Sequence, residues 1–295
     1  MKVPRVPFKF DRLTRWHALA AAGMALLGIA VTFEAWRDIH FIASNDDEYS
    51  QIFLVPLVAA WLIWVRRMRL RHCPVRGTIL GPVLAIAGAL ISSYGFNHGV
   101  QSLWHGGALL GGVGGGVGVV GKTAPIRFLP AGVVLIFLIP IPGDLRQRIA
   151  IPLQGYTAQI AKVMLDLARI ETEVSGNTLI VNGVPVMIAE ACNGMRLVMP
   201  LLLVAYAFAY GLPLRNGVRM AILLVSPLTA LACNVARTLP TIWLYGRQDE
   251  IIARQFHDWS AWAMLPVAFL ILMGVIRLFR WAALPVERYT LASQG

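Results

Sequence analysis

The run GVRMAILLVSPLTALACNVAR, residues 217–237, decides the fold class, because it is almost uninterrupted apolar sequence with arginines only near its ends. A helix of about 20 apolar residues is long enough to cross the hydrocarbon core of a bilayer. The run therefore predicts a membrane-spanning helix. Its last turn carries Asn234 and Arg237. Polar groups at a membrane boundary are costly to bury, so both are candidates for function.

The rest of the chain repeats this pattern. Hydrophobic residues make up 57% of the 295 residues and charged residues only 14%, whereas a soluble domain carries about 25% charged residues. The apolar residues gather in blocks of span length. We expect about eight spans, at residues 17–35, 52–65, 77–95, 103–121, 126–142, 195–212, 217–237 and 258–276. The expected fold is an all-α polytopic membrane protein that forms a single domain over residues 1–295.

The charges are distributed unevenly between the two sides of these spans. Of the 26 Lys and Arg residues, 17 fall before the first span or at every second boundary after it, where Asp11 and Glu287 are the only acids. The positive-inside rule assigns this side to the cytoplasm. We therefore expect both termini to be cytoplasmic and the first block to be a span rather than a cleaved signal peptide. Topology accounts for the net charge of +11, so nucleic acid is not an expected partner.

The longest stretch between spans, residues 143–191, falls on the outer side. Leu153, Tyr156, Ile160, Met164 and Leu167 recur in it at helical spacing, and polar residues occupy the opposite face. This pattern predicts a helix that lies in the membrane interface. The following run TLIVNGVPVMI, residues 178–188, has two β-prone segments around Asn182-Gly183. That dipeptide is a strong turn signal, so we expect a short β-hairpin.

Three predicted helix ends place reactive groups at the same outer boundary. Cys192 and Arg196 begin the sixth span, Asn234 and Arg237 end the seventh, and His257 begins the eighth. A thiol at a helix N-terminus is favoured as the thiolate, and Arg196 one turn later adds positive charge.

A histidine can then transfer protons and an arginine can stabilise an oxyanion, which together favour nucleophilic catalysis. Each group taken alone also has a structural interpretation, as a packed thiol, a snorkelling arginine or an interface histidine. Cys233, a second thiol, is deeper in its span and is expected to pack. Three cysteines are too few for a disulfide framework.

These motifs carry a family resemblance. The segments AEACNGMRL (189–197), NVARTLP (234–240), FHDWSAW (256–262) and DDEYSQIFLVPLVAAWLIWVRR (46–67) are similar to those of the exosortase/archaeosortase family of multi-pass membrane cysteine proteases and transpeptidases. The resemblance implies Cys192 as nucleophile, Arg237 as the arginine of the catalytic set and His257 as the proton-transfer residue, with Arg196 and Asn234 in support. Two positions depart from the family pattern. Asn193 replaces a serine or small residue, and Ser50-Gln51-Ile52 replaces Ser-His-Gly.

The resemblance also implies a reaction and its partners. Such enzymes act at the extracytoplasmic face of the bacterial inner membrane, on secreted proteins with a C-terminal signal of a Pro-Glu-Pro-like motif, a transmembrane helix and a basic tail. Cys192 would form a thioester and pass the acyl group to an acceptor that the sequence does not identify. The expected partners are the substrate protein and the lipid bilayer. This chemistry needs no metal or cofactor.

Two other functions stay open at this point. The acidic run Asn45–Glu48 could hold a metal and a sugar donor in a membrane glycosyltransferase, although such a run is usually a solvated turn. Pro200, Pro227 and the glycine-rich fourth span could belong to a transporter with broken helices.

Two further motifs are given structural interpretations. Residues 116–123 match the P-loop pattern, but a preceding membrane span does not provide the strand that a P-loop follows. His98 and His105 are expected to be interface residues.

Overall fold

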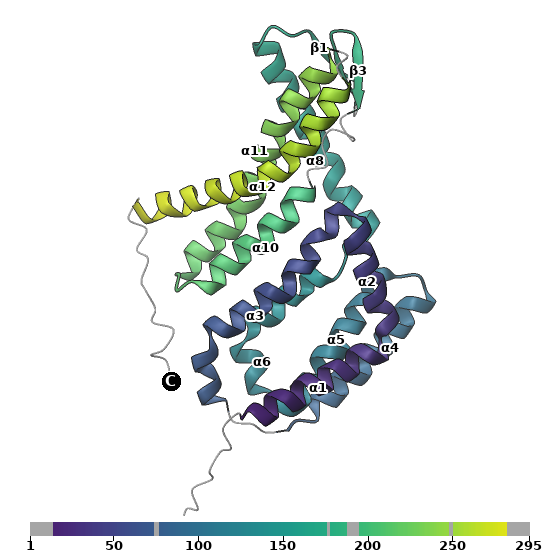
Figure 1. Cartoon of the computed structure of the whole chain (residues 1–295), viewed down its shortest axis with the longest axis vertical. Coiled ribbons are helices and arrows are strands. Elements are labelled where there is room, and N and C mark those ends of the chain that lie inside the picture. Colours follow the sequence, from purple (N-terminus) through teal and green to yellow (C-terminus); the bar gives the residue numbers. More distant parts are fainter. Residues whose placement is uncertain (1–13, 74–76, 176–177, 188–194, 248–249, 282–295) are drawn as a thin grey trace, which may run out of the picture. The chain divides into compact units, whose positions relative to one another are not determined.

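The computed structural model describes residues 14–73, 77–175, 178–187, 195–247 and 250–281 (Figure 1). It divides into two compact units, which we describe separately. Within the described residues, the first unit contains residues 14–46 and 52–140, and the second contains residues 47–51 and 141–281. The all-α membrane architecture is confirmed, with one small sheet in addition. The expected single domain stays a prediction.

The helices of the first unit follow one another with short connections. They are α1 (Arg15–Val31), α2 (Phe33–Asn45), α3 (Val55–Val65), α4 (Leu80–Asn97), α5 (Gln101–Val120), α6 (Thr123–Arg127) and α7 (Leu129–Val134). There are also three 3₁₀ segments. Segment η1 (Asp47–Leu54) precedes α3, η2 (Arg67–His72) follows α3, and η3 (Leu135–Leu138) follows α7. The first residues of η1 belong to the second unit. The closest packing of the first unit is that of α5 against α4 and α1.

Glycines explain how α1, α4 and α5 come so close. A Cβ atom added to Gly88 of α4 would overlap the backbone of Gly111 on α5, and one added to Gly28 of α1 would overlap the same glycine. Residues without a side chain let helix backbones meet directly, which is how small residues drive helix association in membranes. The P-loop pattern lies at the end of α5, preceded by helix, as expected.

The second unit contains a three-stranded sheet between helices. Its elements are α8 (Gly143–Leu167), β1 (Thr172–Ser175), β2 (Thr178–Val181), β3 (Val184–Met187), α10 (Met195–Gly211), α11 (Asn216–Tyr245) and α12 (Glu250–Trp281). The sheet has the order β1-β2-β3 and is antiparallel throughout. The hairpin around Asn182-Gly183 is confirmed as β2–β3. Strand β1 was not expected, because TEVS is too short and too polar to be recognised as a strand.

Two apolar clusters hold this unit together. In the first, α10, α11 and α12 pack through residues that include Leu201, Ile222 and Leu272. In the second, one face of the sheet packs on α8 and α11 through a set of buried residues. These are Ala158, Ala161, Leu165, Leu179, Val181, Val186 and Ile242. The sheet is thus fixed to the C-terminal part of α11.

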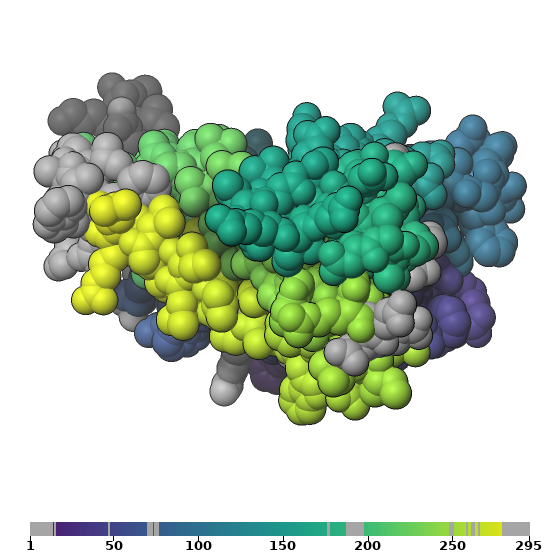
Figure 2. Space-filling view, turned by 90° about the horizontal axis from the view of Figure 1, so that it is seen from above, coloured from purple at the N-terminus to yellow at the C-terminus, as the bar shows by residue number. Residues whose placement is uncertain are grey.

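Helix α8 is confirmed as a helix with an exposed apolar side. Tyr156, Ile160, Met164 and Leu167 are exposed, and α8 forms a broad part of the surface seen from above (Figure 2). A further face of α8, which carries Ala158, Ala161 and Leu165, contacts the sheet and α11. The sequence pattern did not predict this contact. At its end, Asp166 accepts a hydrogen bond of 2.5 Å from the hydroxyl of Thr172, which joins α8 to β1. The location of α8 in the membrane interface stays a prediction.

The number of spans is lower than expected. Among the described residues, four helices are long and apolar enough to cross a membrane, at Glu48–Val65, Leu80–Asn97, Gln101–Val120 and Asn216–Tyr245. Two bent pairs raise this number to six if each is one span. The bends, of 83° between α1 and α2 and of 88° before α8, interrupt apolar blocks that composition alone would join. The apolar parts of α10 and α12 are shorter, at Val198–Gly211 and Pro266–Leu278.

Candidate functional site

Among the described residues of the second unit, a row of buried polar side chains lies on one face of α11. Arg237 and Thr238 lie three and four residues after Asn234, and Thr241 lies four and three residues after them, so a helix brings all four to one side. All four are at most 1% exposed. A buried guanidinium is costly unless it is paired and hydrogen-bonded. Within this apolar helix, the cluster is therefore the kind of feature that function retains.

Hydrogen bonds order this face. The Nη2 group of Arg237 donates to the side-chain oxygen of Asn234 over 3.1 Å. The hydroxyls of Thr238 and Thr241 donate to the backbone carbonyls of Asn234 and Arg237, over 2.8 Å and 3.0 Å. The two threonines bond to their own helix backbone, and the side chain of Asn234 bonds to the guanidinium. The cluster can hold a fixed positive charge where negative charge develops in a reaction.

The same part of α11 adjoins the sheet. Ile242, five residues after Arg237, lies in the cluster that contains Val186 of β3, and Leu239 packs against that cluster. Strand β3 ends at Met187, five residues before Cys192 in the sequence. The segment of α11 that carries the polar face therefore also packs against the sheet, whose last strand ends five residues before Cys192 in the sequence.

The remaining predicted site residues have different outcomes. Cys192 lies outside the described residues. Arg196 lies in the first turn of α10, and only its backbone is described. His257 lies on α12 and is half-buried, and its backbone carbonyl accepts a hydrogen bond of 3.0 Å from the buried hydroxyl of Ser260. The structure thus brings Asn234 and Arg237 together, while the meeting of His257 with Cys192 stays a prediction.

Cys233 has the surroundings of a packing residue. It is 2% exposed and belongs to the apolar cluster with Leu201, Ala230 and Leu272. The expectation that it packs is in accord with this environment. A thiol surrounded by alkyl groups is poorly suited to form the thiolate that attacks a substrate.

The acidic first loop forms contacts that the sequence did not predict. Glu48 is buried and accepts a hydrogen bond of 2.6 Å from Arg146 at the start of α8, which makes an ion pair. The hydroxyl of Tyr49 donates to the carbonyl of Ile141 over 3.0 Å. The interpretation of this run as a solvated turn is therefore wrong for Glu48. The partners are 98 residues apart in the chain, and no local spacing relates them.

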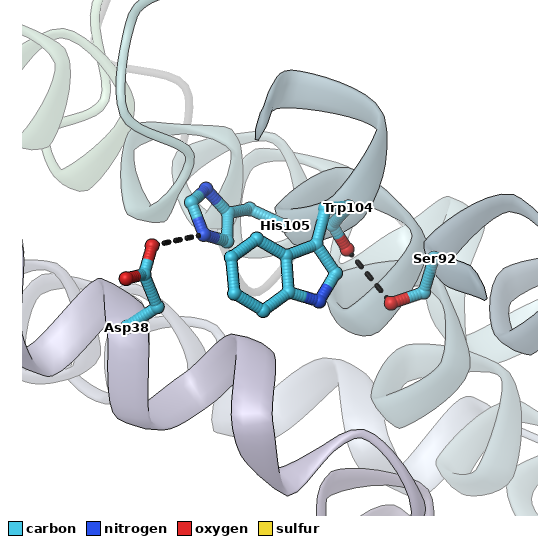
Figure 3. A network of polar contacts seen from close by, with 4 residues as sticks. All are labelled: Asp38, Ser92, Trp104 and His105. Atoms are coloured by element: carbon cyan, nitrogen blue, oxygen red, sulfur yellow. Dashed lines mark hydrogen bonds and ion pairs between the residues drawn. The ribbon is translucent and has the colours of Figure 1, made fainter. Parts of the chain in front are cut away.

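A second polar contact that the sequence missed lies in the first unit (Figure 3). His105 of α5 is fully buried and donates from Nε2 to Asp38 of α2 over 3.0 Å, and its ring stacks on Trp104. The carbonyl of Trp104 in turn accepts a hydrogen bond of 2.9 Å from Ser92 of α4. The expectation of an interface histidine is wrong for His105. Its partner, Asp38, lies after a bend that hydropathy does not reveal.

The comparisons with known proteins agree with the sequence motifs. A family model described as transmembrane exosortase (Exosortase_EpsH) matches residues 36–274. No curated protein and no solved structure matches the chain significantly. The family match includes the first-loop segment, the polar face of α11 and His257, and it spans well over half of the sequence. The chain therefore belongs to the transmembrane exosortase family.

Proposed function

We propose that this exosortase is a membrane cysteine endopeptidase and transpeptidase that cleaves the C-terminal sorting signals of secreted proteins. The observation that carries the proposal is the buried Asn234–Arg237 pair on the part of α11 that packs against the sheet. A fixed guanidinium in an apolar setting is suited to an acyl-transfer site. Family membership supports the class of reaction.

The proposed mechanism uses Cys192, Arg237 and His257. The Cys192 thiolate attacks the carbonyl carbon of the scissile peptide bond, and the carbonyl oxygen becomes an oxyanion that Arg237 stabilises. The carbon–nitrogen bond then breaks, and His257 in its protonated form donates a proton to the leaving amine. The product is a thioester on Cys192. An acceptor nucleophile attacks this thioester, gives its proton to His257 and releases the thiolate.

Asn234 and Arg196 have positioning roles in this proposal. The hydrogen bond from Arg237 to Asn234 holds the guanidinium in one orientation, so that no reorganisation is needed when the oxyanion forms. Arg196 lies on α10, one helical turn after Cys192 in the sequence, and adds positive charge that favours the thiolate. The substrates carry a Pro-Glu-Pro-type motif followed by a transmembrane helix. The site faces the extracytoplasmic side of a bacterial inner membrane, with both termini in the cytoplasm.

An immunoblot of membranes that contain enzyme and substrate tests the proposal. A secreted protein with such a signal and a C-terminal tag is co-expressed with the wild type, Cys192→Ala or Cys233→Ala at matched levels. We expect the wild type and Cys233→Ala to remove the tag and Cys192→Ala to leave it in place. Tag removal by Cys192→Ala would exclude Cys192 as the nucleophile.

The same preparation separates the two alternative functions. Activity lost on addition of a chelator would favour a metal-dependent glycosyltransferase, and solute flux that survives Cys192→Ala would favour a transporter. The ion pair of Glu48 with Arg146 gives that carboxylate a partner within the protein, which supports the peptidase over the transferase.

A further inference from the structure

The geometry of the β2–β3 hairpin determines which backbone groups face outward. Asn182 and Gly183 both have positive φ, of 51° and 77°, which is the signature of a two-residue type I′ turn. The flanking pair, Val181 and Val184, is then hydrogen-bonded in both directions. Because pairs alternate along an antiparallel ladder, Ile180 and Pro185 form a non-hydrogen-bonded pair. The missing N–H of Pro185 agrees with this position.

The outer edge of β3 consequently has a defined set of hydrogen-bonding groups. The carbonyl of Pro185 and both backbone groups of Met187 point away from β2, since Met187 and Thr178 form the next non-hydrogen-bonded pair. The sheet order makes β3 an edge strand among the described strands. An edge strand is a template for pairing with another extended chain. This edge offers two acceptors and one donor.

The place of this edge in the unit connects it with the proposed site. Val186 packs inward in the cluster with Ile242 of α11, so β3 is fixed beside the helix that carries Arg237. Cys192 follows Met187 by five residues in the sequence. A chain that paired with β3 would therefore lie beside the strand that ends five residues before Cys192 in the sequence.

We propose that the outer edge of β3 binds an extended segment of the substrate polypeptide as an added strand. This inference rests on the proposed function and deepens it, because it names the part of the protein that holds the substrate backbone. Main-chain hydrogen bonds supply affinity in this mode of peptide recognition. Met187 exchanges two bonds with the added strand, and the carbonyl of Pro185 accepts a third.

Pro185 favours a substrate peptide over a second copy of this chain. A residue opposite Pro185 loses one hydrogen bond, because proline has no N–H to donate. If two copies of β3 paired with one another, this loss would occur in both. A Pro-Glu-Pro peptide meets it only once when its two prolines, which share one orientation in a strand, direct their nitrogens away from β3.

Binding of a synthetic peptide to purified protein in lipid nanodiscs tests the proposal. The peptide carries the Pro-Glu-Pro signal with its flanking residues, and the protein is the Cys192→Ala variant, so that binding is measured without cleavage. N-methyl groups are introduced one at a time at the non-proline positions. We expect the affinity to fall about tenfold at alternate positions only, because an added strand directs every second N–H toward β3.

Substitutions in the protein provide a matched comparison. Met187→Pro removes the outward N–H of β3 and should weaken binding about tenfold. Val174→Pro makes the equivalent change on the outer edge of β1, where Val174 is paired with Leu179, and should leave binding unchanged. Pro185→Ala adds an outward N–H and should strengthen binding. Thermal unfolding of each variant checks that the sheet remains folded.

The possible outcomes distinguish this inference from the proposed function. Three results would overturn the edge proposal. N-methylation could weaken binding equally at all positions or at none, Met187→Pro and Val174→Pro could have equal effects, or the peptide could fail to bind. Self-association through β3 that the peptide does not displace would overturn it as well. If alternate sensitivity is found but the wild type never cleaves the peptide, the binding edge stands and the peptidase reaction falls. If the wild type cleaves while Met187→Pro binds normally, the reaction stands and the edge proposal falls.

Discussion

Arg237 and Asn234 are joined side chain to side chain, three residues apart on α11, with both groups only 1% exposed. The pair combines a charge that cannot be neutralised with an amide that fixes its direction. It provides the first prediction. Arg237→Lys keeps the charge but loses the planar fork, and we expect processing of the tagged substrate to fall by about 100-fold or more.

Asn234→Ala tests the positioning role of the amide. We expect an intermediate loss of about tenfold in kcat with little change in KM, because the guanidinium remains but is less well oriented. Arg219→Ala, at the opposite end of the same helix, serves as control and should process normally. If Asn234→Ala lowers the amount of folded protein and leaves kcat unchanged, the amide is structural and has no catalytic relevance.

The glycine contacts of the first unit provide the second prediction. Gly88→Ala inserts a methyl group into the backbone of α5, and we expect a loss of about 1 to 3 kcal/mol in the free energy of unfolding. Gly274→Ala in α12 is the matched control, because among the described residues no atom beyond its own helix backbone lies within 4 Å of the added carbon. Reversible unfolding in mixed micelles measures both. If Gly88→Ala and Gly274→Ala had the same free energy of unfolding, this result would contradict the close packing of α4 with α5.

The third prediction concerns the ion pair between Glu48 and Arg146. Their side chains are 10% and 35% exposed, so solvent screens the pair only in part. We expect Glu48→Gln and Arg146→Gln each to cost about 1 kcal/mol of stability and the double variant to cost less than their sum. The exposed pair of Glu34 with Arg37 is the control. Additive costs at Glu48 and Arg146 would mean that the contact does not stabilise the fold.

The fourth prediction concerns the reactivity of Cys73, which lies between spans. Burial raises the pKa of its thiol, and the nearby charge of Arg127 opposes this only in part. Since the thiolate is the reactive form, maleimide labelling should be slow at neutral pH and should accelerate at a higher pH than for an exposed cysteine. Because its pKa is raised on folding, this thiol stabilises the folded protein at low pH. Its contribution to stability declines as the pH rises above the pKa that the thiol has in the unfolded chain.

Labelling is measured in a Cys192→Ala, Cys233→Ala background, so that Cys73 is the remaining thiol. The same protein denatured in detergent gives the reference profile. A folded-state profile that coincides with the reference would contradict the buried position of Cys73.

Local patterns predicted those parts of the fold that depend on local physics. The apolar run 217–237 predicted the core of α11, and Asn182-Gly183 predicted the turn between β2 and β3, because span length and turn conformation are properties of adjacent residues. The bend between α1 and α2 was missed. It depends on how α2 packs on α5, and hydropathy contains no information on that contact.

The same distinction applies to the candidate site. The spacing of Asn234 and Arg237 on one helix made their contact predictable. The partners of Glu48 and His105 are far from them in the sequence, so only the folded chain reveals these contacts. The only signal in the sequence for the role of Arg146 is that an unusually acidic loop requires a cation elsewhere in the chain.

The glycines of α1, α4 and α5 have a consequence for reading sequence variation in this family. Where backbones touch, every larger residue is excluded, so selection at Gly28, Gly88 and Gly107 would be as strict as at a reactive side chain. A map of invariant positions would then mark two regions of the chain with equal strength. The one that carries Arg237 holds groups of the proposed reaction, and the other records the distance between three helices.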